Sequence, residues 1–338
     1  MRYEIFFVNL KQFLINNKYL ILQIQEYSTK KYNSNILKIY GISQDLDTKN
    51  YIIVLEYAEG GNLNDWINKY YKTYNWFDKI LTLVSIISGL GEIHEKQMVH
   101  CDFHTGNILI KSDGFMKNDA YIADMGLCGE VGNLDKTEIY GVMPYVAPEV
   151  LRSKPYTQAA DIYSLGMIMY FIATGKQPFG DCAHDHHLVL DICNGIKPEI
   201  SEQEAPKCYI DLMKRCWDSN PDNRPSATEI YDLVSSFCTI CIGIKDTRPS
   251  NRDPPDIFYT TPNKLYEDYE IKDQFKKAEE YRKSHASFSK ENIQPTVHTQ
   301  AIYISRLLNS FTKNISIHND SLELGDLLKL VGLLNCHV

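Results

Sequence analysis

Three oxygen-bearing side chains in one part of the chain could together carry out phosphoryl transfer. Asp102 and Asn107 stand five residues apart in HCDFHTGNILI, and Asp124 follows Asn107 by seventeen residues, in ADMG. Phosphoryl transfer needs a carboxylate beside the attacking hydroxyl, and hard oxygen ligands that hold Mg²⁺ against the nucleotide phosphates. Asp102 could supply the first group, and Asn107 and Asp124 could supply the second.

The elements that must position these residues fall into two classes along the chain. Strand-like runs are IFFVNL, NILKIYGIS and YIIVLEYA, with QDLDTKN as a hairpin turn between the last two, and later the short pieces NILI and AYIAD. Helical spacing of apolar residues is seen in LNDWINKYY, DKILTLVSIISGLGEIHE, TQAADIYSLGMIMYFIA, DHHLVLDIC, YIDLMKRCW and SATEIYDLVSSF. KYLILQIQEY could add a short helix near the start. A small strand-rich part before a larger helical part predicts an α+β fold.

Composition excludes several classes of protein. Hydrophobic residues make up 44% of the 338 residues and charged residues 23%, which is enough apolar material for a core and excludes a wholly disordered chain. The net charge of −8 argues against a nucleic-acid partner. Nine scattered cysteines favour reduced thiols and a cytoplasmic location over a disulfide scaffold. No run of eighteen apolar residues is present, so we expect no membrane span.

The motifs, taken in order, resemble those of the protein kinases. HCDFHTGN is similar to the catalytic-loop pattern H-R-D-x-x-x-x-N, DMG at 124–126 stands where D-F-G is expected, and APE at 147–149 is unchanged. VLEYAEGGNL resembles a kinase hinge, with Leu55 as gatekeeper. DIYSLGM resembles the central helix whose aspartate, here Asp161, braces the catalytic loop. PDNRPS offers Arg224 as the partner of Glu149. The resemblance covers roughly residues 5 to 237.

This resemblance implies a fold, an activity and a set of site residues. It implies a bilobal fold with a small, incomplete β-rich N-lobe and a larger helical C-lobe. The implied activity is ATP- and Mg²⁺-dependent phosphorylation of serine, threonine or tyrosine hydroxyls in a protein substrate or signalling partner. Asp102, Asn107 and Asp124 would be catalytic, and Asn107 and Asp124 would bind Mg²⁺. The residues that would hold the nucleotide are Lys11, Glu56, Ala58 and Leu109. The motifs DMG and IYGVMPYVAPE, together with the hinge sequence, resemble those of the tyrosine-kinase-like group, including families expanded in some fungi.

Departures from the family pattern leave alternatives open. Only ten residues precede Lys11, in V-N-L-K, and no glycine occurs before Gly41, so the sequence lacks a Gly-rich loop over the phosphates. Gln23 stands where the family has the glutamate that pairs with this lysine, and Cys101 replaces the arginine of H-R-D. A pseudokinase or scaffold that binds partners without turnover is therefore one alternative. A truncated gene model of an active kinase is another.

The remaining features predict the domain limits and give weaker signals. We expect an incomplete N-lobe at 1–58, a C-lobe at 59–238 and a largely irregular tail with potential helices at 239–338. In that tail, SLELGDLLKLVGLL could form an amphipathic helix. The histidines of AHDHHL are better explained as a polar loop leading into a helix than as a metal site. Cys238 and Cys241 have no further ligands at zinc spacing.

Overall fold

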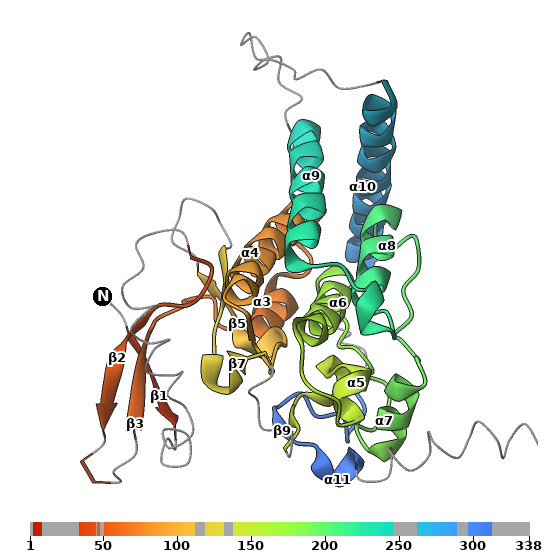
Figure 1. The fold of residues 1–338 in the computed structure, drawn as a ribbon. Helices are drawn as coiled ribbons and strands as arrows, with labels where there is room; N and C mark the ends of the chain where they lie inside the picture. Colours follow the sequence, from red (N-terminus) through yellow and green to blue (C-terminus); the bar gives the residue numbers. More distant parts are fainter. Residues whose placement is uncertain are drawn as a thin grey trace, which may run out of the picture.

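The computed structural model describes residues 3–8, 34–44, 46–47, 51–111, 119–131, 138–245, 262–288 and 297–312 (Figure 1). Its strands are β1 (Tyr3–Val8), β2 (Ile39–Gln44), β3 (Tyr51–Glu56), β4 (Met98–Val99), β5 (Ile108–Lys111), β6 (Asp119–Ile122), β7 (Gly129–Glu130), β8 (Tyr140–Gly141) and β9 (Arg306–Leu307). Its α-helices are α3 (Leu63–Tyr70), α4 (Trp76–Glu95), α5 (Pro148–Leu151), α6 (Gln158–Thr174), α7 (His186–Cys193), α8 (Lys207–Cys216), α9 (Ala227–Lys245), α10 (Pro262–Phe288) and α11 (Asn309–Thr312).

A three-stranded antiparallel sheet stands beside the helical part. Its strand order is β1–β3–β2, and Val54 in the central strand pairs with Ile5 on one side and Gly41 on the other. The predicted hairpin is confirmed, because β2 and β3 pair directly. β-branched and aromatic residues favour this pleated arrangement. The predicted helix in KYLILQIQEY lies outside the described residues.

Two apolar helices form the centre of the larger part. α6 is buried on nearly every side, as its near-continuous apolar sequence requires. It ends at Gly175, whose φ of +70° lies in the left-handed region. A Cβ at Gly175 would stand 2.6 Å from the Tyr71 ring, so only glycine fits there. α4 begins at Trp76, two residues before the predicted start, because the side chain of Asn75 caps it by accepting from the Asp78 amide.

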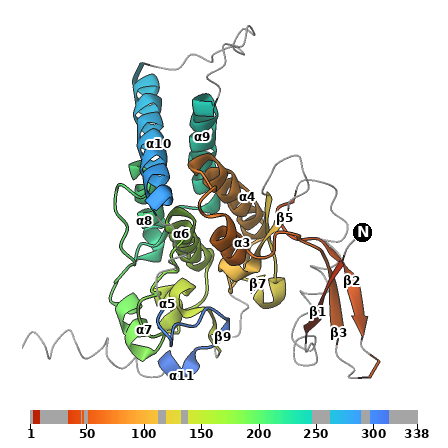
Figure 2. The same cartoon turned by 180° about the vertical axis from the view of Figure 1, so that it is seen from behind.

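The remaining helices and short strands surround this centre. Figures 1 and 2 show α9 alongside α4 and α10, while α5 and α7 lie at the opposite end of α6. Two antiparallel pairs, β4–β7 and β5–β6, lie against α4 and flank the loops that carry Asp102 and Asp124. Within the described residues, no helix combines the length and apolar character needed to cross a bilayer.

α9 extends past the domain boundary predicted at 238 and ends at Lys245.

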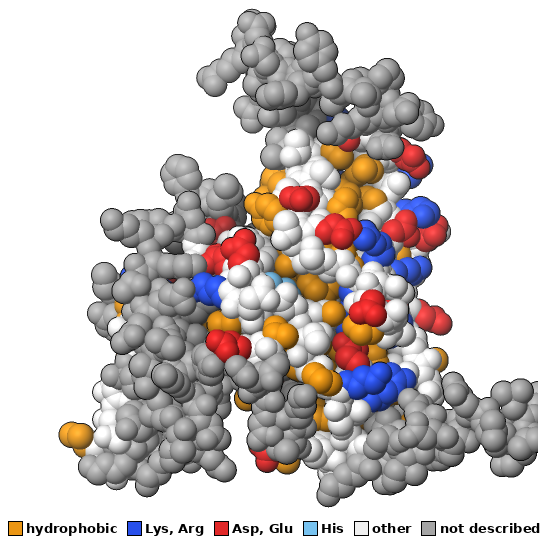
Figure 3. Space-filling view, in the orientation of Figure 1, with side chains coloured by type: hydrophobic (Ala, Val, Ile, Leu, Met, Phe, Trp, Pro, Cys, Tyr) orange, Lys and Arg blue, Asp and Glu red, His pale blue; other side chains and the backbone are white. Residues whose placement is uncertain are grey.

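Two segments beyond residue 245 pack onto the helical part. In α10 the buried ring of Phe275 packs 5.9 Å from Trp76 and 5.8 Å from Phe237, centroid to centroid. Charged side chains gather along α10 (Figure 3). Lys277 and Asp273 of this helix form an ion pair. The second segment, 297–312, contains β9 and α11, whereas the apolar stretch SLELGDLLKLVGLL lies outside the described residues.

Candidate active site

The loop between β4 and β5 brings Asp102 and Asn107 together. Nδ2 of Asn107 donates to the Asp102 backbone carbonyl at 2.9 Å and lies 3.4 Å from the Asp102 Oδ2 atom. Because the amide nitrogen is engaged, the amide oxygen of Asn107 is the atom left to bind a cation. Asp102 is 8% exposed, and within the described parts of the chain its Oδ1 has no partner at normal hydrogen-bond distance. A buried acceptor left in this way suits a bound hydroxyl.

His104 completes the immediate surroundings of Asp102. Its Nδ1 accepts from the Gly106 amide at 3.1 Å, which leaves the proton on Nε2, 3.6 Å from Asp102 Oδ1. Burial raises the pKa of Asp102, but the donor groups of His104 and Ser305 and the charges of His104 and His100 outweigh burial, so the pKa is lowered. Asp102 is therefore held ionised, the form that can accept a proton.

Asp161 braces the loop from the central helix α6, as the resemblance implied. It is fully buried, and its Oδ2 accepts from the His100 amide at 2.8 Å while its Oδ1 accepts from the Cys101 amide at 3.2 Å. His94 Nε2 also lies 3.0 Å from Oδ2. Cys101 adopts a φ of +69°, an uncommon conformation for a non-glycine residue, and these two hydrogen bonds hold it. Burial raises the pKa of the Cys101 thiol well above its usual value, so Cys101 is not an activated nucleophile.

Asp124 enters the site from the end of β6. The preceding residue, Ala123, donates its amide to the Asn107 carbonyl at 2.8 Å, and its own carbonyl lies 3.1 Å from Nε2 of His100. Asp124 has φ +55° and ψ +64°, and its Oδ1 accepts from the Gly126 amide at 3.3 Å. Its side chain is exposed. Asp124 lies one residue beyond this link to Asn107, and an exposed carboxylate and an amide oxygen are ligand types that fit Mg²⁺.

Two of the residues expected around the nucleotide, Ala58 and Leu109, lie together in the structure. Ala58 and Leu109 share a small buried apolar cluster with Leu37 and Ala123, against which Leu55 packs. This cluster joins the segment after β3 to the strands that lead into the loops of Asn107 and Asp124.

Of the other two residues expected to hold the nucleotide, Glu56 lies within the described residues and Lys11 does not. Glu56 donates its amide to the Lys38 carbonyl at 2.9 Å, and its carboxylate pairs with Lys111 at 2.5 Å. Lys11 lies outside the described residues, as does Gln23.

A buried ion pair supports the segment behind the site. Arg224 donates Nη1 and Nη2 to the two carboxylate oxygens of Glu149, at 2.6 and 2.8 Å, as the resemblance implied. Its Nη1 also donates to the Ala159 carbonyl at 2.7 Å, and its Nε to that of Asp218 at 2.9 Å. α5 is therefore tied to the start of α6 and to the loop before α9.

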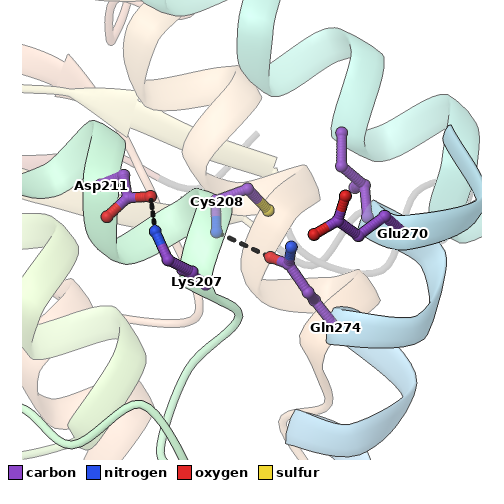
Figure 4. Close-up of a pocket in the computed structure, with 6 residues that line it drawn as sticks. Lys207, Cys208, Asp211, Glu270 and Gln274 are labelled. Carbon is purple, nitrogen blue, oxygen red and sulfur yellow. Dashed lines mark hydrogen bonds and ion pairs between the residues drawn. The ribbon is translucent and has the colours of Figure 1, made fainter. Parts of the chain in front are cut away.

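The histidines of AHDHHL do not gather around one point in the structure. His184 is buried, and its ring nitrogens bond to the backbone of Ile302 and Phe179, whereas His186 and His187 are exposed at the start of α7. No group of three metal-ligating side chains occurs in the parts of the chain that the structure describes. Figure 4 shows a pocket between α8 and α10, which contains none of the candidate catalytic residues and is lined by Lys207, Cys208, Asp211, Glu270, Ile271 and Gln274.

Comparison with known proteins decides the family. The model of the protein kinase domain matches residues 16–234, well over half of the chain. The chain belongs to the protein kinase domain family. Its sheet and its larger helical part are consistent with the α+β kinase fold.

The kinase domain is similar to serine/threonine kinases from several lineages. Identity is 31% over 212 residues to a serine/threonine-protein kinase/receptor, R826, of Acanthamoeba polyphaga mimivirus, and 32% over 204 residues to a serine/threonine-protein kinase of Dictyostelium discoideum. It is 28% over 243 residues to the human receptor-interacting serine/threonine-protein kinase 1. The aligned parts cover 62%, 59% and 66% of this chain, but only 12%, 12% and 35% of these relatives.

Proposed function

We propose that this kinase domain transfers the γ-phosphoryl group of ATP, in the presence of Mg²⁺, to a serine or threonine hydroxyl of a protein. The observation that supports the proposal is the position of Asn107 between the other two residues: it holds Asp102 through its amide nitrogen, and its backbone carbonyl binds the residue before Asp124. The relatives that are named serine/threonine kinases support the choice of hydroxyl.

Each of these residues has one role in the proposal. Asp102 orients the acceptor hydroxyl and takes its proton, for which its lowered pKa keeps it ionised. The Asn107 oxygen and the Asp124 carboxylate would hold Mg²⁺, and Asp161 positions the loop without touching substrate. Bound Mg²⁺ and ATP would supply the phosphoryl group and the counter-charge for its oxygens.

We further propose that ATP lies between the hinge and the cluster of Ala58 and Leu109. Apolar side chains there would contact adenine, the backbone of Glu56 and Ala58 would hold its edge, and Lys11 would bind the α- and β-phosphates. Support comes from the shared cluster of Ala58, Leu109 and the gatekeeper Leu55. Lys11 rests on the sequence motif alone.

Two finer assignments are also proposals. We assign the chain to the tyrosine-kinase-like group. The sequences of its DMG motif and of its hinge support this assignment, as does its similarity to the human receptor-interacting kinase. We also assign it a cytoplasmic location, supported by eight free thiols among the described cysteines.

A binding role without turnover is the second candidate. It is favoured by Cys101, a partly buried thiol that replaces the arginine of the family motif and offers no cation to a phosphorylated loop. In that case the site would hold a nucleotide or a partner, and Asp102 would accept no proton.

Two variants separate these candidates. Asp124→Asn should abolish a Mg²⁺-dependent rise in melting temperature on ATP binding, whereas Asp191→Asn, at an exposed position on α7, should retain it. Asp102→Asn should keep the rise but lose about 10²–10⁴-fold in phosphorylation of a generic protein substrate. A Mg²⁺-dependent rise without any transfer would favour the binding role. Transfer that survives Asp102→Asn would contradict the proposed mechanism.

A further inference from the structure

The segment 297–312 forms a β-ladder directly beside the candidate active site. β9 pairs antiparallel with β8, so that Arg306 lies opposite Gly141 and Leu307 opposite Tyr140. The ladder continues beyond these residues, because the Leu308 amide donates to the Ile139 carbonyl at 2.7 Å. The Ile139 amide in turn donates to the Asn309 side chain at 2.8 Å. A chain far along the sequence is thus held in extended form against the segment that precedes APE.

This ladder brings Ser305 close to Asp102. A Cβ built on Gly141 would stand 3.7 Å from Asp102 Oδ1, so the β8 end of the ladder abuts the carboxylate. Ser305 immediately precedes Arg306, the residue opposite Gly141. The backbone pairing therefore brings Ser305 next to the strand residue that abuts the Asp102 carboxylate.

Anchors hold the segment on both sides of Ser305. On the N-terminal side the Ile302 amide donates to Nδ1 of the buried His184 at 3.0 Å, and the Tyr303 hydroxyl donates to the Pro178 carbonyl at 2.9 Å. On the C-terminal side the guanidinium of Arg306 donates to the His184 carbonyl at 2.7 Å. Leu308 is fully buried in the main core.

Between these anchors, two apolar side chains of the segment are exposed to solvent. Ile304 is 75% exposed and Leu307 is 42% exposed, so neither side chain fixes the segment through burial. Ser305 is half-buried between them. Anchors on either side of a serine that lies close to a proton acceptor form the arrangement that a bound peptide substrate requires.

We propose that residues 302–308 occupy the peptide-substrate site of the same chain, with the hydroxyl of Ser305 as the phosphoryl acceptor. The inference rests on the proposed function and extends it to a substrate class: an extended serine peptide with arginine one residue after the serine and a buried leucine three residues after it. Other protein substrates then have to displace this segment, so the same contact limits access to Asp102.

The transfer step balances with ATP as the co-reactant. Oγ of Ser305 forms a bond to the γ-phosphorus, and the bond from that phosphorus to the bridging β-oxygen breaks, with its electron pair leaving on ADP. The hydroxyl proton passes to Asp102. The phosphoserine formed carries close to two negative charges beside the Asp102 carboxylate, and their repulsion favours release of the segment.

Phosphate mapping on the full chain tests the acceptor. After incubation with Mg²⁺ and labelled ATP, mass spectrometry should find phosphate on Ser305, at a rate independent of protein concentration because the transfer is intramolecular. Ser305→Ala should lose that label, and Ser310→Ala, at an exposed serine five residues away, should retain it. Label elsewhere or on an added protein, but none on Ser305, overturns the inference while the proposed function stands. No label on either overturns both.

Amide hydrogen exchange tests the placement without ATP. Ser305→Glu would set a second carboxylate beside Asp102, so exchange of the Leu308 amide should quicken by at least about tenfold. Ser310→Glu should leave that amide protected. Unchanged protection in Ser305→Glu would show that residue 305 does not face Asp102, and would overturn the inference.

Discussion

The guanidinium of Arg224 and the carboxylate of Glu149 form a two-pronged ion pair at 2.6 and 2.8 Å, and both side chains are almost entirely buried. Two further backbone carbonyls accept from the same arginine. Removal of a single partner would leave an uncompensated charge in the interior, which costs far more than loss of an exposed pair.

Arg224→Met should therefore lower the free energy of unfolding by about 3–5 kcal/mol, measured by urea denaturation. Arg215→Met is the matched control, because Arg215 and Glu229 form an exposed pair, and such pairs contribute about 0–1 kcal/mol. Equal losses in the two variants would contradict a structural role for the buried pair.

His104→Leu should move the acid limb of kcat/KM to higher pH. The pKa of Asp102 is lowered in part by the donor group and charge of His104, so their loss raises that pKa and Asp102 takes up its proton at a higher pH. The measurement is the pH profile of transfer to a protein substrate. His187→Leu, at an exposed position in α7, should leave the profile unchanged. A drop in rate with no movement of the limb would show that His104 acts only on packing.

Lys79 should make stability rise between about pH 7 and 10. Burial, with a smaller contribution from Arg282, lowers the pKa of this lysine to about 7, against opposing effects of Glu279 and Glu204. In that window the unfolded chain binds a proton that the folded chain has lost, so the free energy of unfolding increases with pH.

Lys79→Met should flatten this rise, as measured by urea denaturation at several pH values. Lys207→Met is the control, because Lys207 is fully exposed and its hydrogen bond to Asp211 raises its pKa, away from the window. An identical pH slope in Lys79→Met and the unmodified chain would contradict the burial of a neutral lysine.

Phe275→Ala in α10 should destabilise the whole kinase domain by about 3–5 kcal/mol, because this ring is buried between Trp76 and Phe237. Tyr269→Ala, at a position 72% exposed on the same helix, should change stability by about 0.5 kcal/mol or less. The readout is the urea midpoint followed by tryptophan fluorescence. Loss of α10 helicity with no change in that midpoint would show that the helix is an independent attachment.

Local patterns in the sequence were enough to predict most elements and several site contacts. The hairpin of β2 and β3 and the helices of the larger part follow from apolar periodicity, since each pattern spans the element it predicts. The contacts of Asp161 and Glu149 were implied by the resemblance of their motifs to those of the protein kinases. Lys11 and Gln23 stay predictions, because they lie outside the described residues.

Contacts between distant segments could be seen only once the chain had folded. The segment QAIYISRLLN contains β9, but a strand of two residues is too short to show a periodic pattern in the sequence. The pairing of Arg306 with Gly141 also joins residues that lie far apart in the chain. His104 likewise gained a role only through its distance from the Asp102 carboxylate. Residue types and spacing thus determined the kinase family and its candidate catalytic groups. Tertiary packing decided which segment of the chain lies beside those groups, because that position depends on backbone pairing across the fold.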